Sequence, residues 1–257
     1  MLCDLHTHSA YSHDSETPMS VHCKRAIELG IDCICFTEHL DYNPVDPGYR
    51  LFNPDAYFAG IEQARENFGD KLLVLAGAEF SEPHLYPKEL DACRKYPFDM
   101  IMGSVHFWIE DLFPSQMPEN DISAQEAFDR YWRELLLTVK AGGFDVVGHM
   151  DYPKRFYHHL LYEKGCLEEI FGHMQENDII PEINCGGLRR KFPEPNPGEI
   201  LLQLYKDGGD KMVTLGSDSH KAESLGYGLQ TGKELVQIVE LQEVYIKAHK
   251  RIFVNML

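Results

Sequence analysis

Short apolar segments alternate with helical segments along the chain, and this alternation constrains the fold more than any other feature. Strands that alternate with helices predict βα units arranged around a parallel sheet or a barrel. No linker or change of composition divides the pattern, so we expect a single domain. Seven strands are predicted, at residues 1–7, 31–37, 71–78, 99–105, 144–148, 179–184 and 211–216.

Sequence signals for helix ends support the intervening helices. Thr17, Asn53 and Asn196 are each followed by proline, as an N-cap is when proline takes the first helical position. Ser123 and Glu126 have the spacing of a capping box. The predicted helices cover about residues 18–29, 54–68, 123–141, 160–176, 197–206 and 231–247, with a short helix after residue 87 and an apolar tail at 251–257 that is expected to dock on the body.

Histidine or an acidic residue stands at or near the end of every predicted strand. The first strand leads into His6-Thr7-His8, and residues two apart on a strand point to the same side. A solvated strand end explains a lone His-x-His pair equally well, but it does not explain the repetition at the other strands. In a βα barrel the carboxyl ends of the strands share one face, where active sites lie. We therefore expect one converging metal site.

The residues at the strand ends combine imidazole and carboxylate groups. Such mixed ligation favours zinc, iron or manganese, whereas magnesium and calcium favour shells made almost entirely of oxygen. Three or four ligands per ion would suffice for two to three ions, and closely spaced ions support phosphoryl transfer. The strand-end residues are His6, His8, His39, Glu79, His106, His149, Asp218 and His220.

Composition and charge restrict the classes of partner. The chain has 257 residues and a formal net charge of −17, which disfavours nucleic acid and anionic membranes but not a small phosphorylated molecule. It contains no apolar run of transmembrane length, and no signal peptide is predicted. Seven cysteines without any Cys-x-x-Cys spacing argue against a disulfide framework, so we expect a cytoplasmic protein.

Seven motifs, in order at the strand ends, resemble those of the PHP (polymerase and histidinol phosphatase) superfamily, and most closely those of its histidinol-phosphate phosphatases. The likeness covers essentially the whole chain. It implies an α/β fold, a distorted (β/α)7 TIM-like barrel over residues 1–257, in agreement with the seven predicted strands. The motifs are DLHTHS at 4–9, FTEHLD at 36–41, AEF at 78–80, GSVHF at 103–107, GHMDY at 148–152, EINCGG at 182–187 and GSDSH at 216–220.

The resemblance also implies which side chains hold metal ions. Three ions are implied, with Glu79 bridging two of them. The three ligand sets are Glu79 with His6, His8 and Asp218; Glu79 with His106 and His149; and Asp14 with His39 and His220.

Position 14 departs from the pattern of the family. Many relatives have a histidine there, whereas this chain has Asp14, with His13 beside it. An aspartate can still bind a divalent ion, and His13 is the alternative ligand of the third ion.

Phosphate binding requires positive charge at the mouth of the site. Arg155 follows His149 on the same loop, and Arg189 and Arg190 follow the strand at 179–184. The fork of an arginine side chain matches phosphate oxygens, although a solvated loop charge is the alternative for each residue. The substrate of the histidinol-phosphate phosphatases also carries an imidazole and an amine, and the candidates for recognising these groups are Glu110, Asp41, Tyr42 and Trp108. Glu182 is expected to orient a metal ligand or the arginine loop.

The resemblance implies a metal-dependent phosphomonoesterase that hydrolyses L-histidinol phosphate in histidine biosynthesis. We expect in-line attack of a hydroxide on phosphorus, with Arg155 neutralising the developing charge. Asp218, His220 or a water would protonate the leaving alkoxide. One alternative is another PHP phosphoesterase, acting on tyrosine phosphate or nucleotides. A second is a non-catalytic PHP metal-binding module, which lost ligands or attached polymerase sequence would indicate, and the chain shows neither.

Overall fold

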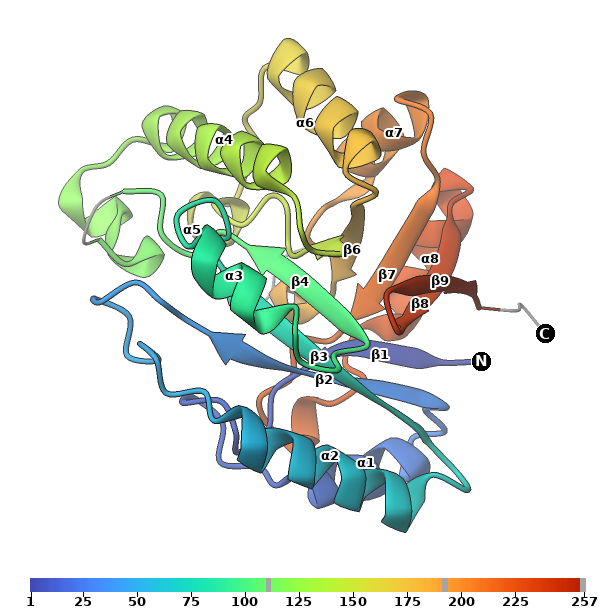
Figure 1. Ribbon diagram of the computed structural model, residues 1–257. Helices are drawn as coiled ribbons and strands as arrows, with labels where there is room; N and C mark the ends of the chain where they lie inside the picture. The colour runs from blue at the N-terminus through green and yellow to red at the C-terminus, as the bar shows by residue number, and fades with distance from the viewer. Residues whose placement is uncertain (110–111, 191–193, 255–257) are drawn as a thin grey trace.

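The computed structural model describes residues 1–109, 112–190 and 194–254, and its centre is one sheet whose strands follow each other in sequence order (Figure 1). Neighbouring strands from β1 to β8 pair in parallel, and β9 pairs antiparallel with β8. The strands are β1 (Cys3–Thr7), β2 (Cys33–Leu40), β3 (Leu73–Ser81), β4 (Met100–Ser104), β5 (Val146–Val147), β6 (Ile180–Asn184), β7 (Met212–Gly216), β8 (Gln242–Lys247) and β9 (Lys250–Phe253).

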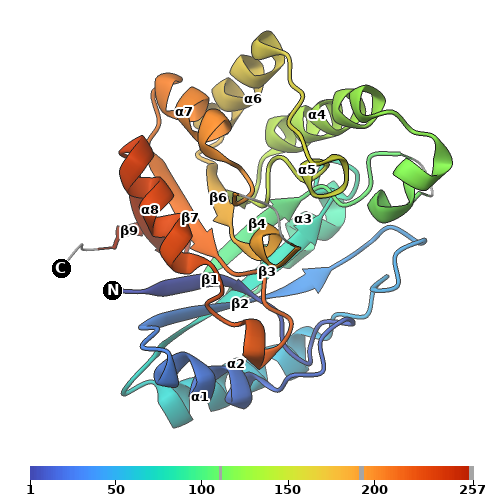
Figure 2. The same cartoon turned by 180° about the vertical axis from the view of Figure 1, so that it is seen from behind.

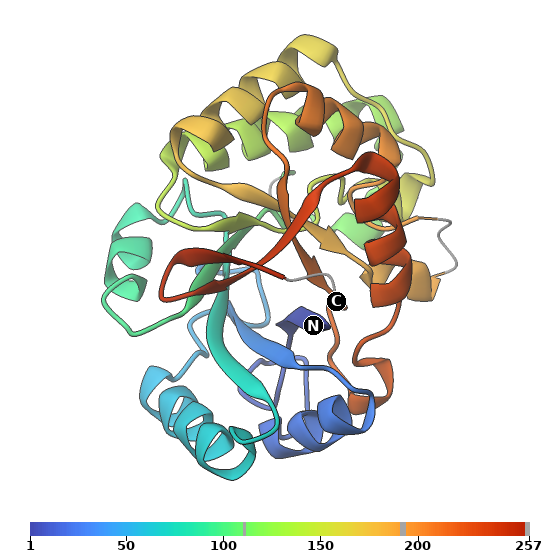
Figure 3. The same cartoon turned by 90° about the vertical axis from the view of Figure 1, so that its right-hand side faces the viewer.

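The sheet closes into a barrel because β1 lies beside β7. The amide of His8 donates to the carbonyl of Ser219 at 2.8 Å, and the amide of Asp218 donates to the carbonyl of His6 at 2.9 Å. These contacts bring the first and last ligand-bearing strand ends together. The predicted α/β fold with a distorted barrel is therefore confirmed, with helices around its outside (Figures 2 and 3).

Two apolar cores stabilise the barrel. The larger core lies between the sheet and the surrounding helices. The smaller core fills the barrel, where Leu5 and Met102 belong to the same buried cluster as Val244 of β8. The β8–β9 hairpin lies across the amino ends of the strands, and the amide of His249 at its turn donates to the carbonyl of Asp99 at 2.9 Å. The hairpin thus closes the end of the barrel that is opposite the ligand residues.

The helices mostly lie where the sequence predicts them. Asn53 accepts a hydrogen bond from the Ala56 amide and Ser123 accepts one from the Glu126 amide, which confirms both N-caps. The α-helices are α1 (Met19–Glu28), α2 (Pro54–Phe68), α3 (Pro87–Cys93), α4 (Ala124–Ala141), α5 (Lys154–Tyr157), α6 (Lys164–Glu176), α7 (Glu199–Asp207) and α8 (Leu229–Val239). Within the described ranges, no helix combines the length and apolar character that crossing a membrane requires.

The predicted helix at 231–247 is wrong in its second half. α8 ends just before Glu240, which takes a left-handed conformation with φ of 60°, and strands β8 and β9 follow. Val244 and Ile246 are buried while their neighbours are more exposed, and this two-residue period is that of a strand. The tail at 251–257 does dock on the body, but as strand β9, and its last three residues lie outside the described residues.

Two predicted N-caps are also wrong. The N-cap of α1 is Pro18 rather than Thr17, and that of α7 is Gly198 rather than Asn196. The side-chain amide of Asn196 instead donates to Oδ1 of Asp151 at 2.5 Å, so this side chain is bonded at the barrel mouth and does not cap α7.

Three other boundaries differ from the prediction. Strands β2 and β3 are longer than expected, so His39 and Glu79 lie within strands rather than after them. The helix predicted from residue 160 begins at Lys164, and α5 precedes it as an additional short helix. His158 separates the two helices because it takes a left-handed φ of 59°.

Tyr57 on α2 stabilises the sheet through its buried hydroxyl. This hydroxyl accepts a hydrogen bond from the Gly77 amide at 2.9 Å and donates to the Phe36 carbonyl at 2.8 Å. Tyr57→Phe leaves buried backbone groups without a partner, so we expect it to lower the free energy of unfolding by about 1–3 kcal/mol. The control is Tyr96→Phe, at a side chain that is 40% exposed, with an expected change within about 0.5 kcal/mol. Urea denaturation measures both, and equal losses would contradict the assignment.

Candidate metal centre and substrate cleft

The predicted ligand residues converge at the carboxyl ends of the barrel strands. All of them except His6 and His8 line a cleft of about 410 Å³. They form three adjacent groups, and within each group the ligand atoms lie within 4.8 Å of one another. The groups are His6, His8 and Asp218; Glu79, His106 and His149; and Asp14, His39 and His220, with His8 also close to the third.

Glu79 lies between the first two groups, and its two oxygens face different histidines. Oε2 is 3.3 Å from Nε2 of His6 and 3.4 Å from Nε2 of His8. Oε1 is 3.0 Å from Nε2 of His149 and 3.3 Å from Nε2 of His106. A carboxylate in this position is placed to bridge two cations, which is the arrangement that the resemblance implies.

Burial and charge act in opposite directions on these groups. Burial raises the pKa of Glu79 and of Asp218, but the surrounding positive groups together outweigh it, His6 most of all in both cases and Arg155 next at Asp218, and hold each pKa well below its usual range. Burial lowers the pKa of His6, but the carboxylates of Glu182 and Glu79 raise it well above its ordinary value. A cation that binds His6 therefore displaces a proton, so metal binding is expected to weaken as the pH falls.

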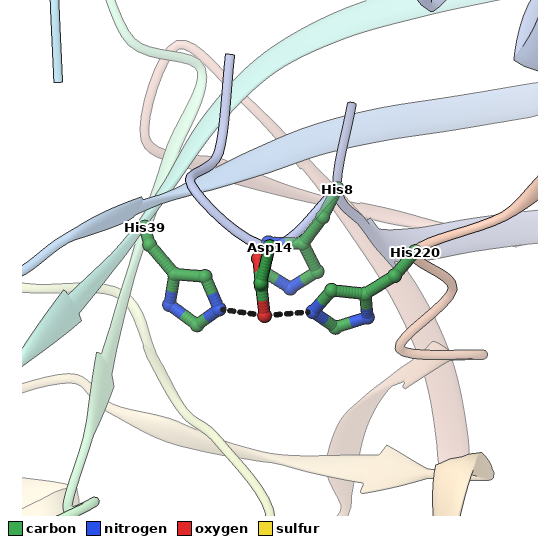
Figure 4. Close-up of side chains that lie close together, drawn as sticks. All are labelled: His8, Asp14, His39 and His220. Carbon is green, nitrogen blue, oxygen red and sulfur yellow. Dashed lines mark ion pairs between the residues drawn. The ribbon is translucent and has the colours of Figure 1, made fainter. Parts of the chain in front are cut away.

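Asp14 projects between two histidines of the third group (Figure 4). Its Oδ2 is 2.9 Å from Nε2 of His220 and 3.6 Å from Nε2 of His39. His13 points elsewhere, with its Nδ1 3.9 Å from Oδ2 of Asp41. Of the two residues that the sequence leaves open, the structure therefore brings Asp14 and not His13 to this group.

Hydrogen bonds behind the rings direct the Nε2 lone pairs of two histidines toward the cluster. Nδ1 of His6 donates to Oε1 of Glu182 at 2.6 Å, because a carboxylate only accepts. Nδ1 of His220 donates to the backbone carbonyl of Asp218 at 3.2 Å. With Nδ1 protonated, Nε2 of each ring is the atom available to a metal ion.

His8 and His106 are oriented in the same way through serines. Nδ1 of His8 lies 3.2 Å from Oγ of Ser12, which donates to Glu38 at 2.6 Å. Nδ1 of His106 lies 3.0 Å from Oγ of Ser81, and this hydroxyl donates to Oδ1 of the buried Asp41 at 2.5 Å. Since each hydroxyl hydrogen is already used, each serine oxygen accepts from the imidazole. The donor set of four oriented imidazoles and inward-facing carboxylates therefore fits divalent transition metal ions.

Arginines bring positive charge to the same cleft. Nη2 of Arg155 donates to Oδ2 of Asp218 at 3.1 Å and to Oδ1 of Asn184 at 2.7 Å. Arg189 donates to the backbone carbonyl of Asp218 at 2.6 Å, and Arg190 also lines the cleft. The three arginines thus stand beside the ligand groups, where their positions after strands β5 and β6 led us to expect them.

The side chains expected to recognise the rest of the substrate are placed differently. Glu110 lies outside the described residues. Asp41, Tyr42 and Trp108 are not among the described residues that line the cleft. The lining instead contains residues that the strand-end pattern does not indicate, although the lengths of the loops at 40–53 and 107–122 were a signal for all of them except Tyr152. These residues are Asp46, Pro47, Phe107, Phe113, Pro114 and Tyr152.

The parallel barrel with clustered histidines and carboxylates at its mouth defines a class of βα-barrel protein with a polynuclear ligand site. Residues 4–186 match the model of the PHP domain, and the chain belongs to this family. The histidinol-phosphatase of Lactococcus lactis subsp. lactis is 28% identical over 94% of this chain and 92% of its own length. The probable histidinol-phosphatase of Thermotoga maritima is 26% identical over 89% of this chain and 88% of its own.

A solved structure is similar over the full length of the barrel. The crystal structure of histidinol phosphate phosphatase from Lactococcus lactis subsp. lactis, in complex with zinc, L-histidinol and phosphate, superposes with a TM-score of 0.84. The two sequences are 26% identical, and the match covers 98% of each chain. The similarity therefore includes the region after residue 186, which the family model does not cover.

Glu182 accepts hydrogen bonds from two of the ligand residues. Its Oε1 accepts from His6 and its Oε2 accepts from the His149 amide at 3.1 Å. Glu182→Gln turns one acceptor into a donor, so we expect metal affinity to fall by about 10–100-fold. Competition with a chelating indicator measures this affinity, with Glu66→Gln on the exposed face of α2 as the control. Unchanged affinity in the Glu182 variant would show that this support is dispensable.

Proposed function

We propose that the chain is a metal-dependent phosphomonoesterase that hydrolyses L-histidinol phosphate to L-histidinol and phosphate, as a step of histidine biosynthesis. The observation that carries the proposal is the combination of three adjacent ligand groups with arginines in one cleft. Support comes from the nearly full-length similarity to the Lactococcus enzyme in complex with zinc, L-histidinol and phosphate. We treat residues 1–257 as one barrel domain because strands β1 to β9 form a single sheet.

Two to three divalent ions of zinc, manganese or iron would occupy the ligand groups. Glu79 would bridge the first two ions, and Asp14 would contribute to the third. When bound, such ions lower the pKa of a water and neutralise charge on phosphoryl oxygens.

The arginines would bind and orient the phosphate. The fork of Arg155 matches two phosphate oxygens, and its bonds to Asp218 and Asn184 hold it in one orientation. Its charge would offset the negative charge that develops on the phosphoryl oxygens during in-line displacement. Of the side chains considered for protonating the leaving alkoxide, Asp218 is held in its ionised form, which leaves His220 or a water.

A panel of phosphate monoesters tests the substrate. We expect kcat/KM for L-histidinol phosphate to exceed the values for phosphotyrosine and a nucleoside monophosphate by about a hundredfold or more, since a polar site rejects analogues that leave its groups unpaired. A preference for phosphotyrosine or the nucleotide would favour another PHP phosphoesterase. A metal-loaded protein that hydrolyses none of the esters would favour a non-catalytic module, and the proposal would fail.

Replacing Glu79 tests the metal dependence. Glu79→Gln removes the charge shared by the first two groups, so we expect loss of bound metal together with loss of turnover. The fall in kcat/KM should exceed the roughly 10–100-fold that is typical of changes to outer hydrogen-bond partners of metal ligands. Glu168→Gln, at an exposed position of α6, is the matched control. A Glu79 variant with full metal content and full turnover would refute the assignment.

A further inference from the structure

Lys154 is a buried ammonium group that has no part in the proposed chemistry. It is 1% exposed and directly precedes Arg155 in α5. Its contacts lead through Asp151 and Asn196 to the guanidinium of Arg155. We propose that this chain of contacts aligns Arg155 with the phosphoryl group, and that Asn196 is the positioning residue within it. The inference rests on the proposed function and adds to it the residues that hold the phosphate-binding arginine.

The ammonium of Lys154 lies among two carboxylates and a backbone carbonyl. Its Nζ is 2.5 Å from Oδ2 of Asp151, 3.0 Å from Oε1 of Glu194 and 3.1 Å from the carbonyl of Pro195. Asp151 is 0% exposed, so the charges of this ion pair are both removed from water. A buried ion pair adds little net stability compared with apolar side chains of similar size. A role in fixing geometry therefore explains it better than a role in stability.

Asp151 determines which way the side-chain amide of Asn196 points. Oδ1 of Asp151 lies 2.5 Å from Nδ2 of Asn196, and because a carboxylate only accepts, the amide nitrogen must face it. Oδ1 of Asn196 is therefore the atom left to face Arg155, and it accepts from Nε of that residue at 3.3 Å. Asn196 is fully buried, so bulk water does not compete for these bonds.

The guanidinium of Arg155 is held at two corners and on one face. Its Nη2 donates to Oδ1 of Asn184 at 2.7 Å and to Oδ2 of Asp218 at 3.1 Å. The ring of Tyr152 stacks against the group, with 4.8 Å between its centroid and Cζ of Arg155. These contacts alone would let the guanidinium pivot in its own plane about Nη2. The bond from Nε to Asn196 removes that freedom.

The bonds to Arg155 also select which of its hydrogens can reach a ligand. Of the five N–H hydrogens, those on Nε and Nη2 are used, and the two on Nη1 have no acceptor among the described residues. Arg155 lines the same cleft as the metal-ligand residues, so the Nη1 hydrogens are available to phosphate oxygens. Donors that are fixed before the reaction stabilise developing charge without reorganising during it.

The backbone fixes the two asparagines relative to each other. The amide of Asn184 donates to the carbonyl of Asn196 at 2.8 Å, and the amide of Asn196 donates to the carbonyl of Asn184 at 2.9 Å. Gly187 leaves room for the side chain of Asn196, because a Cβ atom at Gly187 would lie 2.6 Å from Oδ1 of Asn196. A side chain at this position would therefore displace the oxygen that holds Nε of Arg155.

A double-mutant cycle tests whether Asn196 acts through Arg155. The variants are Asn196→Ala, Arg155→Ala and the two combined, each loaded with metal, and kcat/KM for L-histidinol phosphate is measured. We expect Asn196→Ala to lower kcat/KM by about tenfold to a hundredfold, as misplacement of a group that acts on the transition state does. In the Arg155→Ala background its effect should be less than about twofold. Equal falls in the two backgrounds would overturn the proposal.

Binding of inorganic phosphate gives the same cycle a readout that needs no turnover. Calorimetry with metal-loaded protein should show phosphate binding weakened by about threefold to tenfold in Asn196→Ala, the size of one neutral hydrogen bond. The same substitution should change the affinity less than about twofold when Arg155 is already alanine. Asn67→Ala, at an exposed position of α2, is the matched control and should keep the wild-type values.

Gly187→Ala gives a second variant that leaves Asn196 in the chain. The φ of Gly187 lies outside the left-handed region, so alanine is compatible with the backbone, but its methyl group displaces Oδ1 of Asn196. We expect kcat/KM to fall in the wild-type background and to stay within about twofold in the Asn196→Ala background, where this oxygen is already gone.

The outcomes separate this inference from the proposed function. Wild-type kcat/KM and phosphate affinity in both Asn196→Ala and Gly187→Ala would overturn the positioning role. Loss of bound metal from Asn196→Ala in elemental analysis, with wild-type turnover once metal is restored, would also overturn it. If the wild-type protein does not hydrolyse L-histidinol phosphate, the proposed function fails, and the phosphate affinities alone decide whether Asn196 positions Arg155.

Discussion

The buried carboxylate of Glu79 is the interaction on which the rest of the site depends. It is 1% exposed, and it lies between three histidines near Oε2 and two near Oε1. A charge in this position is costly unless it is paired, and here hydrogen bonds and neighbouring charges compensate for the burial. Ser104 donates to its Oε1 at 2.6 Å, which fixes β4 relative to β3. The strands that surround Glu79 are thus held in register by the same group that joins the ligand sets.

The two ends of the barrel have different roles: the amino end stabilises the fold, and the carboxyl end carries the ligand residues. The β8–β9 hairpin and the inner apolar core close the amino end, where the carboxylates of Asp99 and Asp145 bind the hairpin turn. At the carboxyl end, the contact between β1 and β7 brings His6 and Asp218 together from opposite ends of the sequence. This division is the one expected of βα barrels, in which conserved chemistry lies at the carboxyl face.

The sequence predicts the ligand residues well because each follows an apolar strand, and strand character is a local property. The β8–β9 hairpin was missed because a short alternating segment is ambiguous with the end of a helix. Three features depend on loops that fold against distant parts of the chain. Asn196 bonds to Asp151, Asp46 lines the cleft, and Asp14 rather than His13 joins the third ligand group. Local pattern does not encode such contacts, so these features emerged only in three dimensions.

Metal content measured together with turnover tests the central claim most directly. The protein should be purified without chelator and analysed for metals while its turnover of L-histidinol phosphate is measured. We expect two to three equivalents of transition metal per chain, loss of turnover when the metal is stripped, and recovery when zinc, manganese or iron is restored. Full turnover by the metal-free protein would contradict it.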